Sequence, residues 1–154
     1  MPVVPVPPGY HTLTPYLIVD GAARALGWYA EAFGARERMR LAAPGGTIGH
    51  AEIEIGDSCF MLADEHPDIG AKGPGAFGGS PISLHLYVPD VDATIARAVA
   101  AGATVKSAVE DKFYGDRLGS LVDPFGHVWH VATHIEDVTE AEIGRRMAAL
   151  SDKG

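Results

Sequence analysis

The stretch Tyr16-Leu-Ile-Val-Asp-Gly-Ala-Ala-Arg-Ala-Leu-Gly-Trp-Tyr-Ala-Glu-Ala-Phe-Gly-Ala35 decides the fold, because its pattern returns in Leu86-Tyr-Val-Pro-Asp-Val-Asp-Ala-Thr-Ile-Ala-Arg-Ala-Val-Ala-Ala-Gly-Ala103. Each copy is a short apolar run, an Asp, a stretch with apolar residues at helical spacing, and a Gly that precedes an Ala. A repeat of this length indicates two copies of one structural module. The sequence therefore predicts two strand–helix–strands modules that enclose a ligand cavity.

Size and composition narrow the class of protein. The chain has 154 residues, 47% hydrophobic and 21% charged, which is typical of one globular domain. The net charge of −8 argues against nucleic acid as a partner, because phosphate binding needs a basic surface. No apolar stretch approaches the roughly 20 residues that span a membrane. The proline-rich start, residues 1–11, predicts an extended arm rather than a signal peptide, so we expect a cytoplasmic location.

The first module, residues 12–64, reads as a strand, a helix and three further strands. Asp20 is placed to cap the helix, and Gly34 to end it. The single cysteine, Cys59, allows no intramolecular disulfide and no cysteine-based zinc cluster, and we expect it to be a small buried residue. The expected elements are strand 14–19, helix 21–33, and strands 35–41, 50–55 and 59–63.

The second module, residues 81–135, repeats this order after a glycine-rich linker loop, residues 65–80. Loops of this length are often lids or binding loops. Asp123-Pro-Phe-Gly126 has the composition of a type I turn, and Thr139-Glu-Ala-Glu142 that of a capping box opening a helix within residues 136–154. The expected elements are strand 82–88, a helix capped by Asp90 or Asp92 that ends near residue 101, strands 104–109, 117–123 and 127–134, and a helix over 139–150.

Four strings resemble one known superfamily. They are His50-Ala-Glu-Ile-Glu-Ile-Gly-Asp-Ser58, Tyr114-Gly-Asp-Arg117, Asp123-Pro-Phe-Gly-His127 and Ala132-Thr-His134. In this order, on paired modules, they resemble the vicinal oxygen chelate superfamily of glyoxalases, bleomycin-resistance proteins and dioxygenases, and within it the PhnB-like branch. The resemblance implies an α+β fold in which two βαβββ modules form a curved mixed sheet around a ligand cavity, with helices on the outer face.

The resemblance also implies four positions for metal ligands. Aligning the strands places them at Thr14, Met61, Ser83 and His130. Of these only His130 is a good donor, because hydroxyl and thioether groups bind zinc, nickel, iron or manganese poorly. We therefore expect no cofactor and no inherited metal site. The alternative is a divalent metal, zinc, nickel, iron or manganese, at a shifted site built from His50, Glu52, His85 and His130.

His85 and His130 are the candidates for catalysis. Strand alternation puts His85 on the same face as Ser83, and His130 comes from the last strand. The pair could bind a ligand carboxylate, act as acid and base, or bind metal with His50 or Glu52. They could equally be histidines of a polar cavity wall, hydrogen-bonded to their neighbours.

A wider set of residues is expected to contact the ligand. Arg117 could bind an anionic group, or pair with Asp116 or Asp123. The face with His50, Glu52 and Glu54 could line the cavity or face solvent. The predicted ligand-binding residues are Tyr16, His50, Met61, Ser83, His85, Tyr87, Phe113, Arg117 and His130.

These features predict a small-molecule-binding protein that binds or sequesters a hydrophobic or aromatic ligand, and a homodimer as its assembly. The alternative is a metal-dependent lyase, isomerase or dioxygenase, so whether the protein is an enzyme stays open. One fold hosts many chemistries and does not choose between these.

Overall fold

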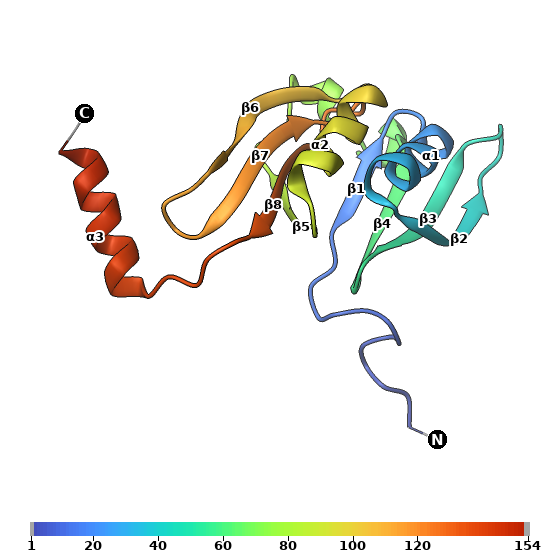
Figure 1. Ribbon diagram of the computed structural model, residues 1–154. Helices are drawn as coiled ribbons and strands as arrows, with labels where there is room; N and C mark the ends of the chain where they lie inside the picture. The colour runs from blue at the N-terminus through green and yellow to red at the C-terminus, as the bar shows by residue number, and fades with distance from the viewer. Residues whose placement is uncertain (1, 153–154) are drawn as a thin grey trace. The chain divides into compact units, whose positions relative to one another are not determined.

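The computed structural model describes residues 2–152. Met1 of the expected arm and residues 153–154 of the expected C-terminal segment lie outside the described residues. The chain divides into two compact units, Met1–Pro81 and Ile82–Gly154, and each has its own sheet (Figure 1).

In the first unit a helix covers one face of a four-stranded sheet (Figure 1). The strand order is β1-β4-β3-β2, with β1 parallel to β4 and the other pairs antiparallel. Leu26 and Tyr29 of the helix are buried together with Ile53 and Leu62 of the sheet, and this apolar layer is the core of the unit. The elements are β1 (Tyr16–Val19), α1 (Ala22–Phe33), β2 (Arg36–Ala42), β3 (Ile48–Ile55) and β4 (Ser58–Asp64).

The second unit repeats this topology. Its strand order is β5-β8-β7-β6, with β5 parallel to β8. Both sheets are therefore mixed, and the predicted α+β class with two βαβββ modules is confirmed. The elements are β5 (Ser83–Tyr87), α2 (Val91–Ala100), β6 (Thr104–Asp111), β7 (Asp116–Val122), β8 (Val128–His134) and α3 (Glu140–Ser151).

The segment expected as a linker loop contains two short 3-10 helices, η1 (Pro67–Ile69) and η2 (Pro74–Phe77). An isolated bridge joins His66 to Ala71, so this part of the segment folds back on itself. The segment is thus more ordered than its glycine content indicates.

Two local predictions for the first module are wrong. The first strand begins at Tyr16 rather than Thr14, whose hydroxyl donates to the backbone oxygen of His11. Asp20 does not cap α1: the N-cap is Gly21 with φ of 103°, in the left-handed region that favours glycine. The capping carboxylate is that of Asp64, whose Oδ1 accepts from the backbone N–H groups of Gly21 at 3.0 Å and Ala22 at 2.8 Å.

Three local predictions for the second module are confirmed. Asp90 caps α2 by accepting from the N–H of Ala93, and Thr139 caps α3 by accepting from the N–H of Glu142. The carboxylate of Asp123 accepts from two backbone N–H groups of its own turn and from the indole N–H of Trp129 at 2.9 Å. The buried carboxylate of Asp123 in the Asp-Pro-x-Gly string therefore has a structural role, because it binds its own turn and Trp129 of β8.

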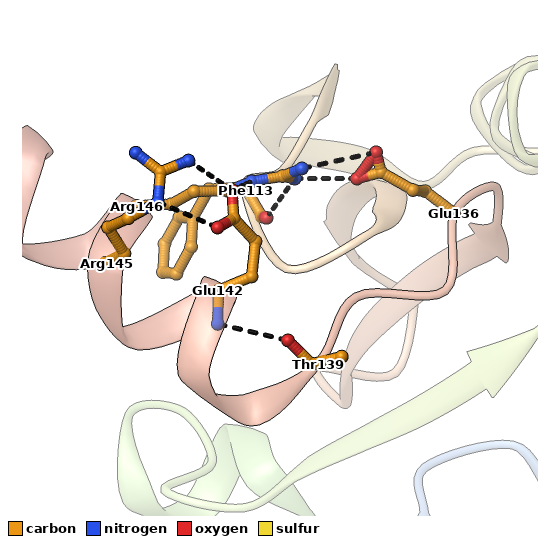
Figure 2. A network of polar contacts seen from close by, with 6 residues as sticks. All are labelled: Phe113, Glu136, Thr139, Glu142, Arg145 and Arg146. Atoms are coloured by element: carbon orange, nitrogen blue, oxygen red, sulfur yellow. Dashed lines mark hydrogen bonds and ion pairs between the residues drawn. The ribbon is translucent and has the colours of Figure 1, made fainter.

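Helix α3 has no buried residue. Arg146 connects it to the β6–β7 turn: its guanidinium donates to the backbone oxygen of Phe113 at 2.9 Å and pairs with Glu136 and Glu142 (Figure 2). Across residues 2–152, none of the helices has both the length and the apolar character to cross a membrane.

Candidate functional site

On the first sheet, strand alternation separates the core residues from the predicted site residues. Tyr16, His50, Glu52 and Met61 lie on the face opposite α1. The register pairs Met61 with Tyr16 on one side and with Glu52 on the other, so these three side chains form one row across β1, β4 and β3. The structure thus brings the predicted residues of the first module together.

A chain of hydrogen bonds connects four side chains on this face. Tyr16 Oη lies 2.8 Å from His50 Nδ1, His50 Nε2 lies 3.3 Å from Glu52 Oε2, and the hydroxyl of Tyr10 donates to Glu52 Oε1. Hydrogen bonds from Tyr10 and then from His50 hold the pKa of Glu52 below its usual value. Burial, followed by the Glu52 charge, raises the pKa of Tyr16. The chain therefore places an acidic carboxylate between the hydroxyl of Tyr10 and the imidazole of His50.

Tyr10 reaches this face because the N-terminal arm packs against the sheet. The guanidinium of Arg38 lies 5.1 Å from the Tyr10 ring centroid, and Cys59 Sγ donates to the backbone oxygen of Gly9. Cys59 is buried as expected, but Arg38 Nη1 lies 3.2 Å from its sulfur, a positive neighbour that the local sequence does not show. Sequence reasoning missed Tyr10 because its partner is 42 positions away along the chain.

A pocket of about 520 Å³ adjoins Tyr16 within the first unit. Its floor is apolar, from Ile18, Ile48 and Ala63, and its walls are the β2–β3 turn and the segment from Asp64 to Ala71. Of the predicted ligand-binding residues, Tyr16 lines it. The only signal for this pocket in the sequence was the long glycine-rich loop, residues 65–80. The first residues of that loop form one wall of the pocket. The lining residues are Tyr16, Ile18, Ala43, Pro44, Thr47, Ile48, Gly49, Ala63, Asp64, Glu65, His66, Ile69 and Ala71.

On the second sheet, Ser83, His85, Tyr87 and His130 share the face opposite α2. His85 and His130 are register partners with ring centroids 6.1 Å apart, and the rings of His85 and Tyr87 are 4.8 Å apart. Burial, then the nearby His85, lowers the pKa of His130. His130 Nδ1 lies 2.6 Å from the hydroxyl of Ser120, which fixes the orientation of the ring.

A second polar group on this face was not predicted. The buried carboxylate of Asp116 accepts from Tyr87 Oη at 3.3 Å and lies 2.7 Å from His134 Nδ1. His134 Nε2 also lies 2.8 Å from Asp137, and the two carboxylates raise the pKa of His134. His134 thus connects β7 to the segment before α3.

Two predicted ligand-binding residues do not lie on the face of the second sheet that carries His85 and His130. Arg117 projects from the face that α2 covers, where its guanidinium pairs with Asp92 at 2.8 Å and Asp111 at 3.0 Å. The partners suggested by the sequence, Asp116 and Asp123, are both engaged elsewhere. Phe113 lies in the β6–β7 turn with its ring against Tyr114.

The alternative metal ligands divide between the two units, with His50 and Glu52 in the first and His85 and His130 in the second. Across residues 2–152, no group of three or more His, Cys, Asp or Glu side chains gathers in a way that could hold a metal ion. At the four positions mapped from the resemblance, the donor chemistry is a hydroxyl at Thr14 and Ser83 and a thioether at Met61, so His130 alone is a strong donor.

Paired βαβββ units, each with polar and aromatic side chains on the face opposite its helix, define an α+β protein of the glyoxalase-like class. Residues 10–131 match the family model of the Glyoxalase/Bleomycin resistance protein/Dioxygenase superfamily. The chain belongs to this superfamily.

The chain is also similar to a curated relative and to several solved structures. The uncharacterized protein Mb0911c of Mycobacterium bovis is 43% identical over 145 residues, 92% of this chain and 93% of the relative. The structure of a gene product of Arabidopsis thaliana has a TM-score of 0.65 at 26% identity, covering 80% of this chain and 98% of that one. The PhnB protein of Bacillus cereus has a TM-score of 0.62 at 18% identity, covering 80% and 99%, a likeness of fold alone.

Proposed function

We propose that this protein binds a small, largely apolar molecule on the sheet face opposite α1. The observation that carries the proposal is the pocket of about 520 Å³, which has the size and the apolar floor of a small-molecule site. Tyr16, which lines the pocket, is in register with Met61 and, through it, with Glu52 on the same face of the sheet. Binding or sequestration of the molecule is the activity that this arrangement supports best.

We propose further that binding needs no metal or other cofactor. The support is chemical: a thioether at Met61 and hydroxyls at Thr14 and Ser83 stand where the metal-dependent relatives are expected to place their ligands. The same strings that suggested the PhnB-like branch support placing this protein there.

A thermal-shift screen of aromatic and antibiotic-like compounds tests the binding proposal. We expect at least one compound to raise the melting temperature in proportion to its concentration, because a ligand that binds only the folded state stabilises it. Amide chemical shifts of Ile18, Ile48 and Ala63 should then move with that compound. A well-folded protein that no compound of a broad library stabilises would argue against the proposal.

The second candidate function is a metal-dependent lyase, isomerase or dioxygenase. It is favoured by His85 and His130, which are adjacent across β5 and β8. The lowered pKa of His130 favours the neutral imidazole that metals bind. This candidate predicts near-stoichiometric zinc, nickel, iron or manganese in protein purified without chelators or a metal-affinity tag. It also predicts loss of that metal in His85→Ala and His130→Ala, and an unchanged metal content in both would exclude it.

We also propose a homodimer as the assembly and the cytoplasm as the location. The exposed apolar side chains of α3, Met147 and Leu150, support the dimer, because a helix with no buried residue gains stability by packing on a partner.

A further inference from the structure

The polar side chains at the pocket of the first unit are two carboxylates, two hydroxyls and one imidazole. Five of the lining residues carry polar side chains, and none of the thirteen, all within the described chain, is Lys or Arg. The five polar residues are Tyr16, Thr47, Asp64, Glu65 and His66.

The hydrogen-bond chain fixes which way the Tyr16 hydroxyl points. Glu52 is ionised and can only accept, so the proton of a neutral His50 ring must lie on Nε2, 3.3 Å from the carboxylate. His50 Nδ1 is then an acceptor, and the Tyr16 hydroxyl donates a hydrogen bond to it at 2.8 Å. The phenol oxygen of Tyr16 is left with its lone pairs for the pocket, so it presents an acceptor to a ligand.

Tyr10 fixes the far end of this chain. Its hydroxyl donates to the second oxygen of Glu52, while the Arg38 guanidinium lies over its ring. The carboxylate is therefore bound on both oxygens and cannot easily rotate away from His50. Tyr10 is a positioning residue that acts through Glu52 and His50.

Two half-buried carboxylates add negative charge to the same rim. Asp64 Oδ1 accepts from two backbone N–H groups and Oδ2 from a third, that of Ile48, so Asp64 is fixed in place at the wall. Glu65 Oε2 accepts from the N–H of Gly73 at 3.0 Å, which holds this carboxylate beside the pocket. A ligand carboxylate here would face like charges with no Lys or Arg among the lining residues, whereas an ammonium group would be attracted.

We propose that this pocket selects small apolar molecules that carry a hydrogen-bond donor, above all a protonated amine, and rejects carboxylates. The donor would bind the Tyr16 hydroxyl, the Glu65 carboxylate at the same pocket would attract a cationic head group, and the apolar body would contact Ile18, Ile48 and Ala63. The proposal rests on the proposed binding function and names the chemical class of its ligand.

Three probes of similar size and different head group test the proposal: benzylamine, benzyl alcohol and benzoate. They are titrated into ¹⁵N-labelled protein at about pH 8, where imidazole is neutral. Benzylamine should shift the amides of Ile18 and Ala63 and bind tightest, benzyl alcohol should bind more weakly, and benzoate should leave these amides unmoved.

Variants then separate the hydrogen bond from the charge. Tyr16→Phe should weaken benzylamine and benzyl alcohol alike, by about 5- to 10-fold for one lost hydrogen bond. Glu65→Gln should weaken benzylamine and leave benzyl alcohol unchanged. Tyr114→Phe, which removes a hydroxyl from the second unit, is the matched control and should bind all three probes as the parent does.

Several results would overturn the proposal. If benzoate binds as tightly as benzylamine, the proposed chemical class of the ligand is wrong, while the proposed binding function still stands. Failure of all three probes to move the pocket amides would remove the pocket as the site, and the thermal-shift screen would then decide the binding function separately. A long-range ¹H–¹⁵N spectrum showing the His50 proton on Nδ1 would contradict the assigned direction of the hydrogen-bond chain.

Discussion

At the scale of single residues, Asp64 connects three elements of the first unit. Its carboxylate accepts from the N–H groups of Gly21 and Ala22 at the start of α1 and from Ile48 at the start of β3. Asp64→Ala leaves all three donors without this acceptor, and we expect it to lower the free energy of unfolding by about 2 kcal/mol. Urea denaturation followed by circular dichroism measures the change.

Asp20→Ala is the control for this experiment, because Asp20 is the residue that the sequence nominates as the cap and its side chain is exposed. It should alter stability by less than about 0.5 kcal/mol. Equal losses in the two variants would show that the cap assignment to Asp64 is wrong.

A second prediction at this scale concerns pH. Asp116 and Asp137 raise the pKa of His134 above its unfolded value, so protonated His134 stabilises the folded state. This contribution is fully present below the unfolded pKa and is lost as pH rises through the folded pKa. His134→Gln should therefore be less stable than the parent at about pH 5.5, with the gap closing toward pH 8.5.

An NMR titration of His134 in Asp116→Asn checks the cause. Removing the buried carboxylate should bring the pKa of His134 down toward its ordinary value, and added salt should reduce the shift in the parent because His134 is exposed. An unchanged titration in Asp116→Asn would contradict the assignment.

Whether the role of such a residue can be predicted from the sequence depends on how many positions separate it from its hydrogen-bond partners. The cap at Asp90 and the turn at Asp123 could be predicted because their partners lie two to six positions away. The donors to Asp64 lie up to 43 positions away, and the hydroxyl that binds Glu52 comes from an arm 42 positions upstream. Such contacts follow from the sheet register and not from any local pattern.

At the scale of elements, the tight β6–β7 turn brings the chain before α3 close to β7. Gly115 has φ of 103°, and its carbonyl accepts from the N–H groups of Ile135 and Glu136. An added Cβ would lie 2.1 Å from the oxygen of Glu136. Gly115→Ala should therefore destabilise the protein by more than about 2 kcal/mol and separate residues 135–139 from the turn.

Gly144→Ala within α3 is the matched control, because nothing lies within 4 Å of the added Cβ. It should raise the helicity of α3 slightly, since glycine costs about 1 kcal/mol in a helix interior. Hydrogen exchange of residues 135–151 distinguishes the two variants: it should accelerate in Gly115→Ala and slow in Gly144→Ala. Similar exchange in both would mean that the turn does not hold this segment.

At the scale of the whole molecule, the repeat extends to equivalent side-chain positions on the two sheets. Tyr16, Met61 and Glu52 form one row in the first sheet, and His85, His130 and Ser120 form the corresponding row in the second. The two rows share a topology and differ in chemistry. The repeat could be predicted from its strand–helix pattern, whereas the chemistry of each row required the register. Thr14 and Ser83, which the strand alignment mapped as ligand positions, are an example: both lie outside these rows.

The last prediction concerns the proposed homodimer. Helix α3 has twelve residues, none of them buried, and isolated helices of that length are marginal in water. Its exposed Met147 and Leu150 lie on one side, three positions apart, while Arg146 fixes the helix to the β6–β7 turn (Figure 2). If the protein is a homodimer through this helix, Met147→Glu with Leu150→Glu should raise the dimer dissociation constant at least about 10-fold in sedimentation equilibrium. Ala96→Glu on the exposed side of α2 should leave it unchanged. A parent that sediments as a monomer at micromolar concentration would contradict the assembly, and the exposed side of α3 would then need another partner.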